Sequence, residues 1–181
     1  HVNAPLHLIA GGTAVGRLAL DRFFGNGVVV SIPKGKWERV AAADLEAARP
    51  AIREGDIVVV VTGWHRHYSD SQAYFGHAPG LDLSAAEWLI ARKVRLVAVD
   101  TPQIDHPLAT SLGAHRNGPH IKTLVADYEA ATGRKASADF PDWNCAHRAL
   151  LRAGIPTIEQ VGGDADAVAG SRCALHAMPW R

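Results

Sequence analysis

The chain has 181 residues, of which 48% are hydrophobic, so it can bury one sizeable core and we expect a single domain over 1–181. The chain has nineteen Lys and Arg residues and eighteen Asp and Glu residues, so it lacks the excess of positive charge that is typical of a nucleic-acid-binding protein. The longest strongly apolar run, 57–61, is far shorter than the roughly 18 to 20 residues of a membrane span. The expected partner is therefore a small molecule, with no nucleic acid and no membrane.

The two cysteines, Cys145 and Cys173, are too few for a disulfide framework, so we expect buried thiols and a reducing, cytoplasmic compartment. The chain opens on His1 rather than Met, and we expect N-terminal and some C-terminal residues of the full domain to lie outside it. A signal peptide would then be invisible here. A homodimer or higher homo-oligomer is a reasonable expectation if a strand edge is exposed.

Short β-branched runs bounded by Gly, Pro and turn residues predict buried strands, and segments with capping signals predict helices between them. The order of these elements lacks the regular alternation of a doubly wound fold, so the expected class is mixed α/β. Strands are predicted over 27–32, 57–62 and 95–100, with weaker candidates over 157–161 and 173–178, and helices over 41–48, 85–93 and 142–153.

Three local signals fix the predicted helix ends and loops. Ser84 with Glu87 forms a capping-box pattern ahead of the second helix, and Asp142 is the expected N-cap of the third. The stretches 113–119 and 133–141 are polar and rich in turn residues, so both are predicted as loops.

The first seven residues, His1-Val-Asn-Ala-Pro-Leu-His7, place two imidazoles and one amide oxygen close together. In an extended stretch, alternate residues project to the same side, so His1 and Asn3 can reach one cation. The spacing alone is equally compatible with exposed or structurally bonded histidines.

A second cluster is predicted from His147 and Glu159. The helix that carries His147 leads through Gly154 into the strand that carries Glu159, so the two side chains can meet at a helix–strand edge. Taken alone, this pair is also compatible with a solvated glutamate.

Together these residues resemble the cyclase family, which includes kynurenine formamidases, isatin hydrolases and trans-dienelactone hydrolases. The heptad is similar to the end of the family motif His-x-Gly-Thr-His-x-Asp-x-Pro-x-His: His1 matches its second His, Asn3 its Asp, Pro5 its Pro and His7 its last His. The first His of the motif would lie four residues before this chain. Later blocks resemble those of the family in the same order, over 75–81, 85–89, 99–105 and 147–159.

The resemblance implies the swivelling β/β/α fold and a metal-dependent hydrolase. It implies that His1, Asn3, His147 and Glu159 are metal ligands for one or two ions, either Zn²⁺ or Mn²⁺. A metal-activated water would attack the substrate, and His7 would act as the general acid/base. The implied reaction is cleavage of an amide, lactam or lactone bond in a cyclic or N-formyl small molecule.

One departure from the family pattern is Asn3, which stands where the family has a metal-bridging carboxylate. A neutral amide oxygen contributes less charge and bridges two ions poorly, so a mononuclear site or weaker metal affinity is favoured. The alternative function is a catalytically weakened homologue that only binds a small molecule.

Three further residues are candidates for substrate binding. Trp64 and Arg66 lie in the loop after the strongest predicted strand, where Arg66 could pair with a substrate carboxylate, and His77 precedes a turn that feeds a helix. The same loop carries His65 and His67, for which a solvated rim is favoured over metal binding. Three other histidines are expected to be exposed in a loop, namely His106, His115 and His120.

Overall fold

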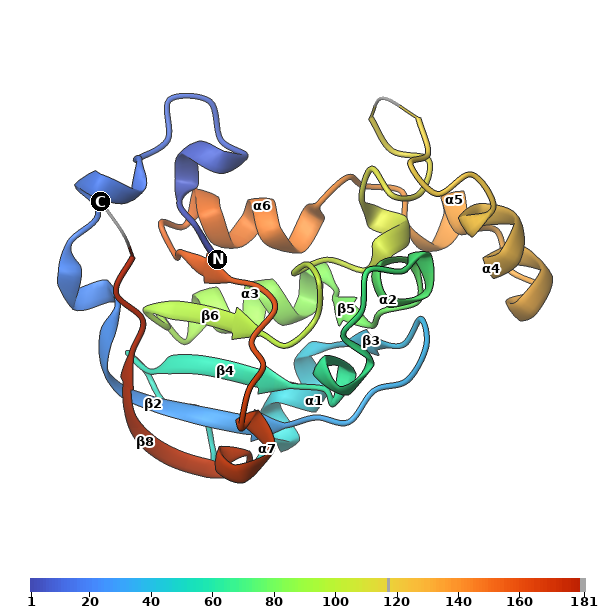
Figure 1. The fold of residues 1–181 in the computed structure, drawn as a ribbon. Helices are drawn as coiled ribbons and strands as arrows, with labels where there is room; N and C mark the ends of the chain where they lie inside the picture. The colour runs from blue at the N-terminus through green and yellow to red at the C-terminus, as the bar shows by residue number, and fades with distance from the viewer. Residues whose placement is uncertain (117, 180–181) are drawn as a thin grey trace.

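A computed structural model describes residues 1–116 and 118–179, and its core is a six-stranded sheet with the order β1-β7-β6-β4-β2-β8 (Figure 1). The four inner strands run parallel, whereas β1 and β8 pair antiparallel at the two edges. The strands of this sheet are β1 Val2–Asn3, β2 Phe24–Ser31, β4 Ile57–Val61, β6 Leu96–Val99, β7 Thr157–Ile158 and β8 Ser171–His176. The mixed α/β class expected from the sequence is confirmed.

A second, two-stranded parallel sheet pairs β3 (Arg39–Val40) with β5 (Gly80–Leu81). The backbone of Gly80 packs so closely on residues 105–106 that a Cβ there would lie 2.6 Å from the carbonyl oxygen of Asp105. This contact fixes the segment that follows β6. The helices are α1 Ala42–Ala47, α2 Gln72–Gly76, α3 Leu83–Ala91, α4 Leu124–Thr132, α5 Ala136–Asp139, α6 Cys145–Arg152 and α7 Ala165–Val168.

Alternate residues of the inner strands face opposite sides of the sheet and build two cores. One core is formed by the strand side chains that pack on α1, α3 and α6, including Val58, Val60 and Val99. The other lies under the N-terminal segment and α7, and it includes Val59, Val61 and Ala98. Because β4 is buried on both faces, its sequence is a continuous apolar run rather than an alternating one.

Several predicted boundaries are wrong. Helix α6 begins at Cys145 and not at Asp142, because Asn144 turns the chain with a φ of 45°. Helix α3 is capped by Asp82, whose carboxylate accepts a bond from the Ala85 N–H, while Ser84 donates to that carboxylate. The predicted loop over 133–141 contains α5. The predicted strand over 157–161 shortens to β7.

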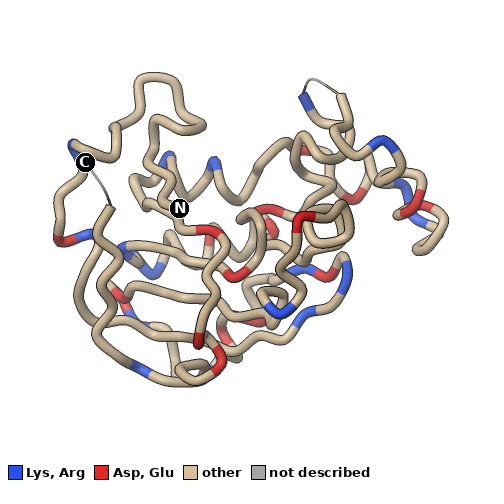
Figure 2. Tube along the Cα trace, in the orientation of Figure 1, with Lys and Arg blue, Asp and Glu red and all other residues tan. Residues whose placement is uncertain are grey.

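The other predicted loop, 113–119, consists of turns and bends, and its residue 117 lies outside the described residues. Figure 2 shows acidic and basic residues interspersed along the trace. Within residues 1–116 and 118–179, no helix is long and apolar enough to cross a membrane.

Candidate active site

Strand β1 brings the start of the chain to β7. Val2 lies opposite Ile158 and Asn3 opposite Thr157, and the Glu159 N–H donates to the carbonyl of His1 at 3.2 Å. Beyond this ladder, His1 Nε2 lies 3.0 Å from Glu159 Oε2, and Asn3 Nδ2 lies 3.4 Å from His1 Nε2. The structure therefore joins the two predicted clusters.

His147 enters the same group from the first turn of α6. Its Nε2 lies 2.7 Å from the hydroxyl of Thr157, and its Nδ1 lies 3.6 Å from Glu159 Oε1. The side chain is buried, which lowers the pKa of His147 to about 3 and keeps the imidazole neutral. A neutral imidazole has one ring nitrogen with a free lone pair, and this nitrogen can bind a metal ion or accept a proton.

Glu159 is held by the loop after β6. Its Oε1 accepts a hydrogen bond from the Ile104 N–H at 3.0 Å, so the carboxylate is fixed between this loop and His1. Burial raises the pKa of Glu159, although the bonds donated to it act in the opposite direction. The geometry presents Oε2 towards the exposed His1 ring.

Asp105 is a further residue of the site, and it lies behind His147 at the start of α6. Its buried carboxylate accepts the N–H groups of Ala146 at 2.8 Å and His147 at 3.0 Å, the unpaired donors at the start of α6. Burial raises the pKa of Asp105 to about 7. Asp105 thus sets the position of His147 through the backbone, and the only sequence signal for it was its place in the block 99–105.

His7 lies beside this group on a 3₁₀ turn over Pro5–His7, where Pro5 occupies the first helical position. Its ring centroid lies 5.5 Å from that of His147. The turn is backed by Gly12, where a Cβ would lie only 2.7 Å from the carbonyl carbon of Pro5. A cavity of about 170 Å³ is lined by His7, Asp105, His147, Glu159 and neighbouring polar residues.

A larger cavity of about 570 Å³ lies beside His1. It is lined by His1, His65, Tyr68, Tyr74, Gln160, Val161, Gly162 and Gly163. His1 therefore borders an open space large enough for a small organic molecule, in addition to its contact with Glu159.

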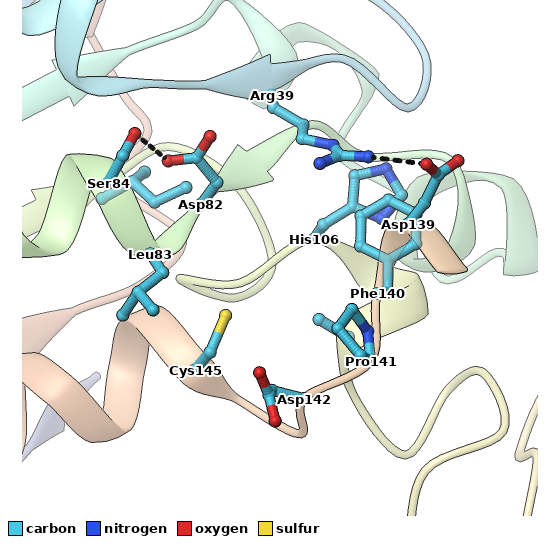
Figure 3. A pocket seen from close by; sticks show the side chains of 12 residues that line it. Arg39, Asp82, Leu83, Ser84, His106, Asp139, Phe140, Pro141, Asp142 and Cys145 are labelled. Atoms are coloured by element: carbon cyan, nitrogen blue, oxygen red, sulfur yellow. Dashed lines mark hydrogen bonds and ion pairs between the residues drawn. The ribbon is translucent and has the colours of Figure 1, made fainter. Parts of the chain in front are cut away.

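A third cavity, of about 260 Å³, is lined by Phe140, Pro141, Cys145 and the charged residues Arg39 and Asp139, which face one another in Figure 3. Burial raises the pKa of the Cys145 thiol to about 12, so this sulfur is not a nucleophile at neutral pH. None of the predicted site residues lines this cavity among the residues described.

Trp64, Arg66 and His77 line neither the 170 Å³ cavity beside His7 and His147 nor the 570 Å³ cavity beside His1. The buried Trp64 donates its indole N–H to the carbonyl of Tyr74, and His77 packs edge-on against Trp37. Arg66 forms a two-pronged ion pair with Asp166, at 2.9 and 2.6 Å. A substrate contact stays a prediction for these three residues.

The expectation of exposure is wrong for His106, which is buried, and for His115, which is half-buried and bonds the carbonyl of Phe140. His120 is exposed as expected. Across the described ranges 1–116 and 118–179, no three or more His, Cys, Asp and Glu side chains are arranged to hold a metal ion. His1 and Glu159 instead converge as a pair.

The comparisons with known proteins give one family. The model of the Cyclase family, described as "Putative cyclase", matches residues 1–106. The kynurenine formamidase of Bordetella avium (strain 197N) is 35% identical over 120 residues, which are 64% of this chain and 52% of that protein. The chain thus spans about half the length of this relative.

Two solved structures share the fold. Isatin hydrolase A from Ralstonia solanacearum superimposes with a TM-score of 0.64 at 21% identity, over 94% of this chain and 60% of that one. A protein described as a potential metal-dependent hydrolase with cyclase activity gives a TM-score of 0.55 at 20% identity, over 88% of this chain and 59% of that one.

Proposed function

The chain belongs to the Cyclase family, and on that premise we propose that it hydrolyses an amide, lactam or lactone bond in a cyclic or N-formyl small molecule. The observation that carries the proposal is the convergence of His1 and Glu159 at 3.0 Å, with His147 and His7 beside them. The names of two similar proteins, a kynurenine formamidase and an isatin hydrolase, support hydrolysis of a C–N bond.

The donor chemistry of this group fits a divalent cation, since imidazole nitrogens and a carboxylate oxygen are ligands of Zn²⁺ and Mn²⁺. His1, Asn3, His147 and Glu159 would be the ligands, with Asn3 donating its amide oxygen. His147 and Asn3 would have to turn towards the ion, because only His1 and Glu159 already converge among residues 1–116 and 118–179. A bound cation of this kind supplies charge stabilisation and lowers the pKa of water. The neutral donor at Asn3 favours one ion over two.

The side chains of the site supply the remaining chemistry. His7 lies in the cavity with Glu159 and is exposed, so it can take a proton from the attacking water and return it to the leaving nitrogen or oxygen. Asp105 fixes the first turn of α6, which holds His147 in place. The pairing of β1 with β7 holds His1 and Asn3.

The proposal is tested by measuring metal content together with hydrolysis of N-formylkynurenine, isatin, a hydantoin-type imide and a dienelactone. Bound divalent metal and hydrolysis that a chelator abolishes would support it. Glu159→Gln is expected to lower the metal content because it removes the anionic donor. Protein that binds no metal and stays inert after Asn3→Asp would favour the alternative, a homologue that only binds a small molecule.

A separate test addresses His7. His7→Ala is expected to retain metal and lose about 10²- to 10⁴-fold in kcat, the usual effect of removing a general acid/base group. His120→Ala, a change at an exposed histidine, is the matched control. Turnover by His7→Ala at the rate of the control would remove His7 from the mechanism.

A further inference from the structure

Thr157 places a hydroxyl at a position of β7 where the surrounding pattern predicts an apolar side chain. It lies opposite Val97 in β6, and paired residues of neighbouring strands share one face of the sheet. On that face, which packs against α6, the strands β2, β4 and β6 all carry valine. Thr157 is fully buried there, and a buried hydroxyl requires a hydrogen-bond partner.

The partner of this hydroxyl is the ring of His147. Thr157 Oγ1 lies 2.7 Å from His147 Nε2, and both side chains are buried. The backbone of Thr157 is paired on both sides, with β1 and with β6, and a β-branched side chain has few rotamers. The hydroxyl is therefore a rigid point of contact for the imidazole.

The other ring nitrogen of His147 faces the carboxylate of Glu159. Its Nδ1 lies 3.6 Å from Glu159 Oε1, a separation longer than a hydrogen bond. The backbone N–H of His147 is held by Asp105 at 3.0 Å. Because His147 is anchored at its backbone and at Nε2, a turn of the ring towards the proposed ion brings Nδ1 to that ion.

The two nitrogens of a neutral imidazole have different roles, since one carries a proton and the other a lone pair. A hydroxyl oxygen can accept the Nε2–H of His147, which leaves the lone pair on Nδ1. A proton on Nδ1 would instead block that nitrogen as a ligand. In metal sites, the ring nitrogen that does not bind the ion usually donates its N–H to a nearby oxygen, and Thr157 Oγ1 lies in the place of that oxygen.

We propose that Thr157 is a positioning residue for the metal ligand His147. Its hydroxyl accepts the hydrogen bond from Nε2–H, which keeps the lone pair on Nδ1 and directs that nitrogen towards Glu159. The inference rests on the proposed function, since it concerns the ion that His147 would help to hold. Thr157 acts on this ion only through His147.

Heteronuclear NMR of the metal-free protein, with isotope-labelled histidine, tests the tautomer without turnover. The signal of His147 is the one lost in His147→Gln, and it should show the Nε2–H tautomer. In Thr157→Val, which keeps the shape but removes the hydroxyl, the Nδ1–H tautomer should become populated. Thr157→Ser keeps the hydroxyl and should restore the Nε2–H tautomer. A proton on Nδ1 in the unmodified protein, or an unchanged tautomer in Thr157→Val, would overturn the proposal.

The affinity for Zn²⁺, measured by calorimetry, tests the consequence for the ion. Thr157→Val is expected to bind Zn²⁺ about 10- to 100-fold more weakly, the usual loss when the partner of a ligand histidine is removed, and Thr157→Ser should stay within about threefold of the unmodified protein. Thr132→Val removes an exposed hydroxyl from α4 and is the matched control. Circular dichroism shows whether each variant is folded. Binding by folded Thr157→Val as tight as that of the control would contradict the role of Thr157.

These measurements separate the inference from the proposed function. Zn²⁺ binding and hydrolysis that Thr157→Val leaves unchanged would refute the role of Thr157 and leave the hydrolase intact. A tautomer that depends on Thr157, in a protein that binds no Zn²⁺ and hydrolyses none of the test compounds, would support the hydrogen bond and refute the metal-dependent hydrolase. If Thr157→Val fails to fold, the tautomer of the unmodified protein and the affinity of Thr157→Ser still decide the proposal.

Discussion

At the scale of single residues, His106 shows how burial sets a protonation state. Its ring stacks on Phe140 at 4.1 Å, its Nε2 lies 3.1 Å from the carbonyl of Trp37, and its Nδ1 accepts the N–H of Leu108. Burial lowers the pKa of His106 to about 3. The neutral ring, with one donor and one acceptor nitrogen, satisfies both partners, and a protonated ring would not.

This protonation state predicts an acid sensitivity. The unfolded histidine titrates near 6.5 and the folded one near 3, so between these values the unfolded state binds more protons. The free energy of unfolding should therefore fall as the pH drops from about 6.5 to 3, by about 1.4 kcal/mol per pH unit per such histidine. His147 adds a contribution of the same sign.

The measurement is urea unfolding at several pH values for His106→Phe and, as a control, His120→Gln. His106→Phe should be less stable at pH 7.5, because the Trp37 carbonyl and the Leu108 N–H lose their partner, but its stability should fall less steeply on acidification. An identical slope in the two variants would contradict the assignment.

The heptad and the pair His147 with Glu159 were predictable because they carry side-chain chemistry at a characteristic spacing. Asp105 and Asp100 were not predicted, because they act by accepting backbone N–H groups whose positions depend on the fold. The wrong N-cap at Asp142 has the same explanation. Asp142 is a residue type that caps helices well, but the N–H groups at the start of α6 are bonded by Asp105 from a distant loop.

At the scale of elements, the packing of β5 on the segment after β6 depends on Gly80. Gly80→Ala is expected to destabilise the protein by about 2 kcal/mol or more, because the added methyl would meet the backbone of Asp105 and His106. Its position also predicts reduced activity, since Asp105 holds the start of α6. Thermal unfolding and kcat are the measurements.

Gly16→Ala is the control for this substitution, because no described atom lies within 4 Å of the added Cβ and the φ of Gly16 is ordinary. Its stability should equal or slightly exceed that of the unmodified protein. If Gly80→Ala unfolds at the temperature of this control, the close approach of the two segments is wrong.

The elements most accurately predicted were the central strands, since β4 is a five-residue apolar run with turn signals on both sides. The two-residue strands β1, β3 and β5 have no detectable periodicity and form only because a partner strand lies beside them. Helix α5 is only four residues long, which is too short to show a helical periodicity, so its sequence predicts a loop.

At the scale of the whole molecule, an ion pair reaches across β2 and ties the edge strand β8 to Asp56, the residue that precedes β4. Arg172 Nη2 lies 2.6 Å from Asp56 Oδ1, and the side chain of Asp56 is only 3% exposed. Arg172→Met should cost about 2 kcal/mol or more, because it leaves a buried carboxylate without its cation. Chemical denaturation gives the value.

Lys93→Met is the matched control, since it breaks the ion pair with Glu54, in which both side chains are more than two-thirds exposed. Its effect should stay within about 0.5 kcal/mol. Equal losses in the two variants would mean that the edge strand does not depend on Arg172.

The fold class was predictable from the mixture of strand and helix signals, whereas the strand order was not. Nothing in the weak signal over 173–178 shows that this strand lies antiparallel beside β2 and that β7 lies between β1 and β6. These neighbours are set by long-range packing.

The contact between His1 and Glu159 joins positions 158 residues apart. Pairings of such wide separation in the chain close late in folding, after local contacts have formed. During synthesis the group that includes both residues is therefore absent until Glu159 has left the ribosome. The proposed hydrolase would therefore be inactive as a nascent chain. During refolding, activity would return only after β1 has paired with β7, and not when the central strands first form.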